Sequence, residues 1–427
     1  MDADRKHPDR NDPVRTDHVQ ALQCMMCGHR YGPREVTYTC PECGPGGILD
    51  VIYDYDAIAR RLTRDRLAGR RERSIWRYAE LLPVDPQGPR PPLQVGWTPL
   101  YHAAELGRSL GCPNLYIKDD GRNATASFKD RASAVGVVKA LEQGSSTIAC
   151  ASTGNAASSL AGIAASVGLD AVIFVPRTAP KAKVAQLLIY GARVFLIRGS
   201  YDQAFDLCLE ATDRFGWYSR NTAYNPYLSE GKKTAALEIC EQLDWKAPDA
   251  VFVSVGDGCI IGGLWKGFHD LLQLGFIDHM PRLVGVQARG CQPIKRAWET
   301  DRPVSPVSPE TMADSIAVGT PRDALKALRA VRQSGGFMLA VSDEDILEAM
   351  RRLACGTGIF GEPAGVTGFA GLMQALSENR VGRDERVVVV MTGSGLKDIE
   401  GALRATPAPV EIDPTLEAVE ECLEGKG

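Results

Sequence analysis

The chain has 427 residues, a hydrophobic content of 44%, a charged content of 24% and a formal net charge of −4. This length predicts two or three domains around a large core, and the weak negative charge argues against nucleic acid or an anionic membrane as a partner. No apolar run approaches the roughly 20 residues of a membrane span. Residues 1–20 are polar and lack the apolar segment of a signal peptide, so we expect a cytoplasmic protein with a poorly ordered tail.

Two cysteine pairs organise the first part of the chain. Cys24 and Cys27 form one Cys-x-x-Cys pair, and Cys40 and Cys43 form a second pair after twelve intervening residues. Two thiolates on a tight turn can hold two adjacent corners of a tetrahedron, so the two pairs predict a closed, structural zinc site. A redox pair, or a ribbon that has lost its metal, is the alternative. The other eight cysteines lie in apolar contexts, and we expect them to be reduced and buried.

Residues 51–95 contain an Arg-rich segment, which we predict to be helical, and then a Pro-rich linker. The next distinctive stretch surrounds Lys129, which directly precedes a small, apolar segment that predicts a buried helix. A lysine acts as a covalent amine only when unprotonated, so its pKa must fall through burial or a nearby cation. Phe128 offers an apolar flank, Arg131 offers a like charge, and a helix N-terminus disfavours the charged form. The alternative is a plain surface lysine in the first turn of a helix.

From residue 146 to residue 391 the sequence alternates short apolar runs with helical segments. Continuous apolar runs of about five residues predict strands that are buried on both faces of a parallel sheet. We therefore predict an α/β fold with two doubly wound units and a cleft between them. The clearest runs are 147–151, 171–175, 193–197, 250–255, 283–287 and 386–391.

Three loops follow predicted strands, at the edge of the sheet where ligands bind in such folds. Ser152, Thr153 and Asn155 offer groups that suit a carboxylate, although a plain helix cap would use the same residue types. Residues 256–263 place glycines at a helix start and match neither the dinucleotide nor the Walker pattern. They predict a phosphate cup of another kind, or a tight strand-to-helix turn. Thr392 lies in the third loop, where its hydroxyl can face a ring nitrogen.

Taken together, these motifs resemble those of fold-type II pyridoxal-phosphate enzymes, and specifically of threonine synthases with an N-terminal zinc-ribbon-like segment. The resemblance runs from about residue 22 to residue 405 and includes motifs beyond the cysteine pairs and the three loops. These are Ser-Phe-Lys-Asp-Arg at 127–131, Asn-Pro-Tyr at 225–227, Glu-Gly-Lys-Lys-Thr at 230–234, Val-Ser-Asp-Glu at 341–344 and Gly-Glu-Pro-Ala at 361–364.

The resemblance implies a role for each candidate site residue. Lys129 would carry pyridoxal 5′-phosphate covalently and move the Cα and Cβ protons of the substrate. Asn155 would bond the phenolic oxygen of the cofactor, Thr392 would face its pyridine nitrogen, and Ser152 and Thr153 would help to hold the substrate carboxylate. In the implied reaction O-phospho-L-homoserine loses phosphate and water adds at Cβ, which gives threonine. The cofactor phosphate would lie against Gly256, Asp257, Gly258, Cys259 and Ile260.

The sequence departs from threonine synthases at positions that commonly serve the substrate phosphate. The family often has a hydroxyl or amide side chain where Ala156 and Ala223 stand, and an arginine where Leu228 stands. Losing such donors weakens the binding of a dianion, so two other reactions stay open: β-replacement on O-phosphoserine, as in cysteate synthases, and an ammonia-lyase reaction on serine or threonine. A non-catalytic zinc-ribbon module is a further alternative. Three cations could compensate for the lost donors: Arg220, Lys118 and Lys232.

The predicted organisation has a tail (1–20), a zinc ribbon (21–50), a linker (51–95), a large cofactor domain (96–135 and 225–405), a small α/β domain (136–224) and an acidic tail (406–427). We expect pyridoxal 5′-phosphate and structural Zn²⁺ as cofactors, a small amino acid as substrate and a homodimer as the assembly.

Overall fold

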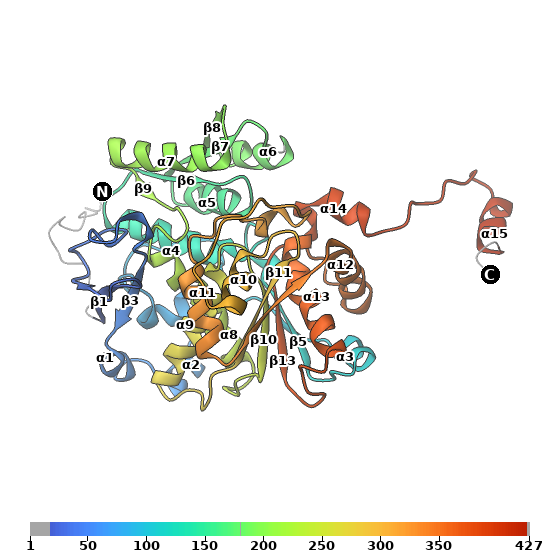
Figure 1. Ribbon diagram of the computed structural model, residues 1–427, viewed down its shortest axis with the longest axis horizontal. Helices are drawn as coiled ribbons and strands as arrows, with labels where there is room; N and C mark the ends of the chain where they lie inside the picture. The colour runs from blue at the N-terminus through green and yellow to red at the C-terminus, as the bar shows by residue number, and fades with distance from the viewer. Residues whose placement is uncertain (1–17, 180, 425–427) are drawn as a thin grey trace, which may run out of the picture.

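The computed structural model describes residues 18–179 and 181–424, which form three sheets and the helices that cover them (Figure 1). Most of the tail predicted for residues 1–20 lies outside the described residues. None of the helices in the described part of the chain is long and apolar enough to cross a membrane.

The largest sheet has six strands in the order β12-β11-β10-β13-β5-β4. Neighbouring strands are parallel except for β4 and β5, which are antiparallel. Strand β13, in the interior of the sheet, consists of four valines and a methionine, all buried, as expected for a sheet that is covered on both faces. The strands are β4 (Leu100–His102), β5 (Leu115–Asp119), β10 (Ala250–Ser254), β11 (Arg282–Ala288), β12 (Phe337–Val341) and β13 (Val387–Met391).

Two apolar cores lie on opposite faces of this sheet, because successive strand residues point to opposite sides. Val388 and Val390 belong to the first core, and Val387 and Val389 belong to the second. The first core is covered by α4 (Lys129–Glu142), α8 (Tyr227–Gln242), α9 (Cys259–Gln273), α10 (Pro293–Thr300) and α11 (Ala324–Gln333). The second core is covered by α3 (Ala104–Leu110), α12 (Asp343–Thr357) and α13 (Pro363–Ser377).

The second sheet has four parallel strands in the order β8-β7-β6-β9. On one face α7 packs Ala204, Phe205 and Cys208 against the strands, and α5 covers the other face. The two larger sheets confirm the predicted fold class, an α/β protein with two doubly wound units. The strands are β6 (Thr147–Ala151), β7 (Asp170–Pro176), β8 (Arg193–Ile197) and β9 (Tyr218–Ser219), and the helices are α5 (Asn155–Ala165), α6 (Lys181–Ile189) and α7 (Tyr201–Phe215).

The N-terminal part forms a small antiparallel sheet in the order β2-β1-β3, with strands β1 (Val19–Cys24), β2 (Arg30–Tyr31) and β3 (Leu49–Tyr53). The Arg-rich segment after it is not one helix, so that prediction is wrong. Asp54 and Thr63 each cap a separate short helix, α1 (Tyr55–Ala59) and α2 (Arg64–Ala68), by accepting a hydrogen bond from the first turn. A 3₁₀ segment follows at Ile75–Leu81.

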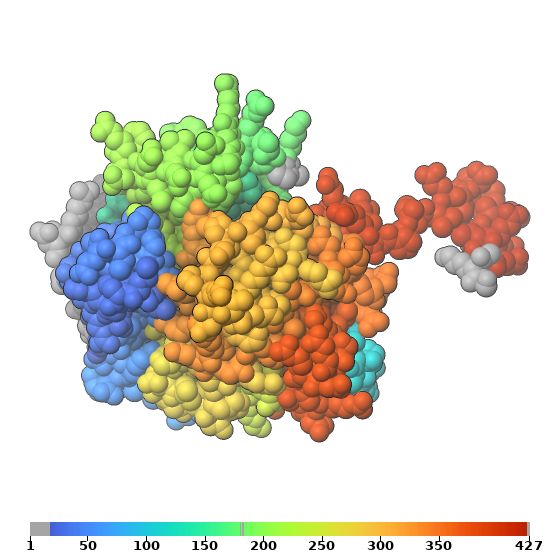
Figure 2. Space-filling model, in the orientation of Figure 1, coloured from blue at the N-terminus to red at the C-terminus, as the bar shows by residue number. Residues whose placement is uncertain are grey.

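The C-terminal part leaves the body of the protein. After α14 (Ile399–Arg404) an extended segment leads to α15 (Leu416–Glu424), which lies away from the rest of the molecule (Figures 1 and 2). None of the α15 residues is buried.

Candidate active site

A cavity of about 530 Å³ is lined by loops from both larger sheets. The loops follow β6, β9, β10 and β13, so they lie at the carboxyl ends of the strands, where α/β folds bind ligands. The structure brings together in this cavity every residue to which the resemblance gave a role in binding cofactor or substrate. These residues are Lys129, Ser152, Thr153, Asn155, Gly256, Asp257, Gly258, Cys259, Ile260 and Thr392.

Lys129 is the first residue of α4, and the loop before it is tied to the loop after β13. The Phe128 N–H donates a hydrogen bond to the Thr392 carbonyl at 2.9 Å, and the Ser394 N–H donates to the Ala126 carbonyl at 3.0 Å. Ala126 has a φ of 64°, a left-handed conformation that is uncommon for alanine. Strained backbone of this kind persists where the surrounding structure holds it in place. Lys129 and Thr392 therefore lie on two loops that backbone hydrogen bonds hold together.

The Lys129 amine is prepared to act as a nucleophile. Burial is the main cause that lowers its pKa to about 8, and the positive charges of Lys232 and Arg220 act in the same direction. Arg131, the like charge expected from the sequence, does not act in this way. Its buried guanidinium pairs with Asp120 at 2.6 Å and with Glu238 at 2.5 Å. That part of the sequence interpretation is wrong, because the neighbouring arginine is already neutralised.

The loop between β10 and α9 has the shape of an anion cradle. Gly258 has a φ of 98°, and a Cβ atom on it would lie 2.8 Å from the Asp323 carbonyl oxygen, so glycine is required there. No side chain caps the N-terminus of α9, which leaves its first amide groups available for an anion. The Asp257 carboxylate accepts a hydrogen bond from the Arg322 N–H at 2.6 Å, and burial raises its pKa. Both effects reduce the electrostatic repulsion between this carboxyl group and a phosphate.

The loop between β6 and α5 offers a second set of free amides. Gly154 occupies the cap position of α5 without a side-chain hydrogen bond, so Ser152 and Thr153 are not plain helix caps. The Ser152 hydroxyl accepts a hydrogen bond from the Gly154 N–H at 3.2 Å within the loop. The hydroxyls and the start of α5 together suit a carboxylate.

Glu362 is a cavity residue to which the sequence analysis gave no role. It occupies the N-cap position of α13 without a side-chain hydrogen bond to the helix. Instead it lines the cavity and accepts a hydrogen bond from the Asn155 side-chain amide, with 2.7 Å between Nδ2 and Oε1. Burial, followed by the negative charge of Asp314, raises its pKa to about 7. The Gly-Glu-Pro-Ala motif at 361–364 was the signal that could have identified it.

The cavity has what pyridoxal phosphate requires. It combines an amine of lowered pKa, an anion cradle at a helix N-terminus, a buried amide held by a carboxyl group and a hydroxyl at Thr392. Its volume of about 530 Å³ lies within the range of ordinary small-ligand sites.

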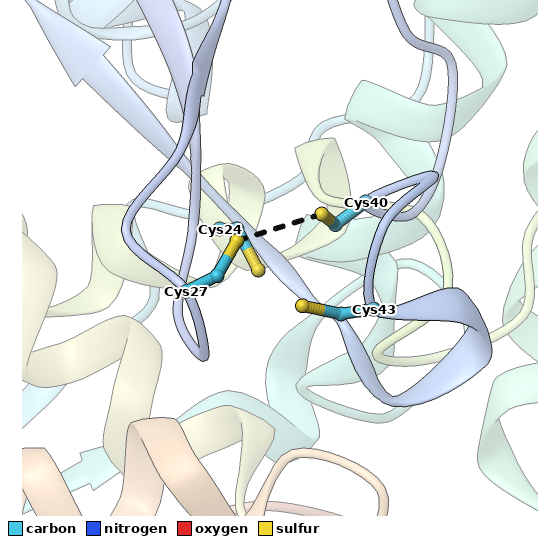
Figure 3. A group of neighbouring side chains, drawn as sticks. All are labelled: Cys24, Cys27, Cys40 and Cys43. Atoms are coloured by element: carbon cyan, nitrogen blue, oxygen red, sulfur yellow. Dashed lines mark hydrogen bonds between the residues drawn. The ribbon is translucent and has the colours of Figure 1, made fainter.

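The four predicted zinc ligands also come together. The Sγ atoms of Cys24, Cys27, Cys40 and Cys43 all lie within 4.8 Å of one another, with the two pairs facing each other (Figure 3). The Cys27 and Cys40 sulfurs are 3.8 Å apart. Zinc–sulfur bonds of about 2.3 Å in a tetrahedron also place the sulfurs roughly 3.8 Å apart. The donor set and its spacing therefore fit a closed zinc site.

Comparison with known proteins gives matches along nearly the whole chain. Residues 92–393 match the family model described as pyridoxal-phosphate dependent enzyme. The threonine synthase of Methanocaldococcus jannaschii is 41% identical over 404 residues, which cover 94% of this chain and 98% of that protein. The threonine synthase of Methanosarcina acetivorans is 42% identical over 410 residues, which cover 95% and 99%.

Solved structures share the fold at lower identity. Diaminopropionate ammonia lyase from Escherichia coli superposes with a TM-score of 0.63 at 20% identity and covers 78% of this chain and 90% of its own. Threonine deaminase from Solanum lycopersicum gives a TM-score of 0.61 at 23% identity, with 72% and 87% covered. At this level of identity the similarity concerns only the fold.

Proposed function

The chain belongs to the threonine synthase family of pyridoxal-phosphate dependent enzymes, and we propose on this premise that it converts O-phospho-L-homoserine and water to L-threonine and phosphate. One observation carries the proposal: residues of the required chemistry, from four separate loops, line a single cavity. Relatives at 41% and 42% identity are threonine synthases over nearly their whole length. Neither β-replacement nor an ammonia-lyase reaction is favoured by relatives of that similarity.

When bound, pyridoxal phosphate supplies an electron sink that stabilises negative charge on the carbon atoms of the amino acid. The amine of Lys129 holds the cofactor in the resting enzyme and, once free, takes up and returns protons at Cα and Cβ. Its pKa of about 8 lets it exchange protons near neutral pH. Asn155, which bonds Glu362, would face the phenolic oxygen of the bound cofactor, and the neutral hydroxyl of Thr392 would face its ring nitrogen without enforcing protonation there.

Substrate orientation falls to the loop before α5. Ser152, Thr153 and the free amides at the start of the helix bind the α-carboxylate. The amide cradle of residues 256–260 would hold the cofactor phosphate, so the substrate phosphate needs a separate partner.

The test is a product assay on purified enzyme supplied with pyridoxal phosphate. O-phospho-L-homoserine should yield threonine and phosphate in equal amounts, and Lys129→Ala should lower the rate by about 10²- to 10⁴-fold or more. Borohydride reduction followed by peptide mapping should place the pyridoxyl group on Lys129. Release of a keto acid from serine or threonine, or turnover of O-phosphoserine without threonine synthesis, would instead assign one of the alternative reactions.

We also propose that Cys24, Cys27, Cys40 and Cys43 bind one structural Zn²⁺, supported by the mutual approach of their sulfurs. The homodimer and the cytoplasmic location stay predictions. Light scattering on the purified protein and fractionation of cells would test them.

A further inference from the structure

Arg220 leaves an unbalanced positive charge in the cavity. It follows β9, lines the cavity and is 1% exposed. Its Nε donates to the Ser133 hydroxyl at 3.1 Å and its Nη1 donates to the Thr222 hydroxyl at 3.3 Å, whereas Nη2 has no hydrogen-bond partner. Among the described residues no carboxylate pairs with it. A buried guanidinium without an anion is costly, so the site is suited to a ligand that brings negative charge.

The other nearby cations are already committed. Arg322 also lines the cavity, but its guanidinium pairs with Asp202 at 3.0 Å. Lys118 does not line the cavity and pairs with the buried Glu238 at 2.7 Å. Lys118 is therefore excluded as a partner of the substrate phosphate.

Lys232 lies on the cofactor side. It is buried on α8 and does not line the cavity, and a Cβ atom built on Gly263, in the first turns of α9 beside the cradle, would lie 2.7 Å from Lys232 Cβ. Its effect therefore falls on the cofactor phosphate. Arg220 is left as the cation that faces the remaining space.

Arg220 is also a neighbour of the position where threonine synthases often carry an arginine. A Cβ atom built on Gly136 of α4 would lie 2.9 Å from Leu228 Cδ2 and 3.9 Å from Arg220 Cγ. The two side chains thus lie near the same point of α4, and an apolar Leu228 avoids a second positive charge near Arg220.

We propose that Arg220 binds the phosphate group of the substrate through Nη2, with the Thr222 hydroxyl beside it. The inference rests on the proposed function, since it names the partner of the phosphate in O-phospho-L-homoserine. A guanidinium forms strong, charge-assisted hydrogen bonds with phosphate. The cofactor carries a phosphate as well, but free amides of α9 already provide for that one, so we assign Arg220 to the substrate.

The experiment compares holoenzyme variants Arg220→Gln, Arg220→Lys and Thr222→Val with a control variant, Arg282→Gln, at an arginine that does not line the cavity and pairs with Glu385. Arg220→Gln should raise both KM for O-phospho-L-homoserine and the inhibition constant of inorganic phosphate by about 10- to 100-fold. Cofactor affinity, measured by absorbance titration, should stay unchanged. Arg220→Lys should recover part of the loss, Thr222→Val should give a smaller increase, and Arg282→Gln should leave the phosphate inhibition constant near that of the wild type.

Stability separates a binding role from a structural one. Because Arg220 is an uncompensated buried charge, Arg220→Gln should unfold at a temperature no lower than that of the wild type when phosphate is absent. A marked loss of stability with unchanged KM and phosphate inhibition would overturn the proposal. Weaker cofactor binding with an unchanged KM would also overturn it, by assigning Arg220 to the cofactor phosphate.

Direct titration with inorganic phosphate tests the anion site independently of whether the protein makes threonine. If the wild-type holoenzyme made no threonine, the function would fail. Calorimetric binding of phosphate by the wild type and its loss in Arg220→Gln would still support the anion site, and equal binding by both would refute it.

Discussion

Glu362 shows how a buried carboxyl group makes the stability of this protein depend on pH. Its pKa rises from 4.5 to about 7 because it is buried. Between these pH values the folded protein retains a proton that the unfolded chain has released, so the free energy of unfolding falls as pH rises through this window. One pKa unit corresponds to about 1.4 kcal/mol, so the cost above pH 7 is on the order of 3 kcal/mol.

Glu362→Gln should remove this dependence. Glutamine has the same shape, can still accept the hydrogen bond from Asn155 and carries no charge. In protein freed of cofactor, we expect the variant to be more stable than the wild type at pH 8, by on the order of 3 kcal/mol at most, and equally stable at pH 4.5. Urea unfolding at the two pH values measures this. A constant difference at both would show that Glu362 does not titrate in this range.

At the site, the residues predicted from the sequence are those in contiguous motifs. Lys129 and the glycines at 256 and 258 were found because each lies in a short segment with its own chemical logic. The role of Glu362 depends on Asn155, 207 positions away, and that of Arg220 depends on a missing partner. The motif around Glu362 and the charge of Arg220 can be seen in the sequence, but neither of these two relations can, so the folded chain is needed to assign the roles.

Among the elements, the ribbon is joined to the helices of the body by buried charges. The Lys266 ammonium donates to the Val51 carbonyl at 2.9 Å, and the Lys326 ammonium donates to the Leu49 carbonyl at 2.8 Å. The Tyr53 hydroxyl donates to Glu230 at 2.7 Å. Strand β3 thus provides hydrogen-bond partners for buried charged side chains on α8, α9 and α11, and the ribbon lies beside these helices (Figure 1).

Loss of zinc should therefore destabilise more than the ribbon. Cys40→Ser removes a ligand and should release β3 from these lysines and from Glu230. Two or more hydrogen bonds to charged groups, at about 1.5–3 kcal/mol each, predict a loss of at least about 3 kcal/mol. Metal analysis and thermal unfolding provide the measurements. Cys112→Ser, at a buried cysteine outside the cluster, is the matched control and should keep its zinc.

If Cys40→Ser lost zinc yet unfolded at the same temperature as Cys112→Ser, the contacts between the ribbon and the body would contribute no stability.

The same buried charges explain where element prediction from the sequence was incomplete. Helix α8 begins at Tyr227 and contains Glu230 and Lys233, which look solvent-exposed in the sequence and therefore do not predict a buried helix. In the structure they are fully buried and paired with each other at 2.6 Å. Strand β12 was missed, although its last residue, Val341, lies in a motif that the resemblance included. The apolar runs named in the sequence analysis, in contrast, were predicted closely, since burial on both faces needs no partner information. The edge strand β8 is the exception to that burial, because Phe195 and Leu196 are exposed.

For the molecule as a whole, the order of strands in the large sheet has a consequence for synthesis. Strand β13 lies between β10 and β5, so the centre of the six-stranded sheet is filled by residues 387–391. The four strands of the smaller sheet all fall between residues 147 and 219. Pairing between distant segments is slow and comes late.

A nascent chain should therefore acquire protease resistance in two stages on the ribosome. Chains halted once about residue 360 has emerged should protect the region of β6 to β9 but leave β5 and β10 open to cleavage. Protection of β5 should appear only after β13 has left the exit tunnel. Limited proteolysis of stalled chains, compared at the two lengths, measures this. Early protection of β5 would mean that the incomplete sheet is stable without β13. Late protection would mean that the apolar edges of β5 and β10 stay unpaired, and need chaperones, during most of the synthesis of the chain.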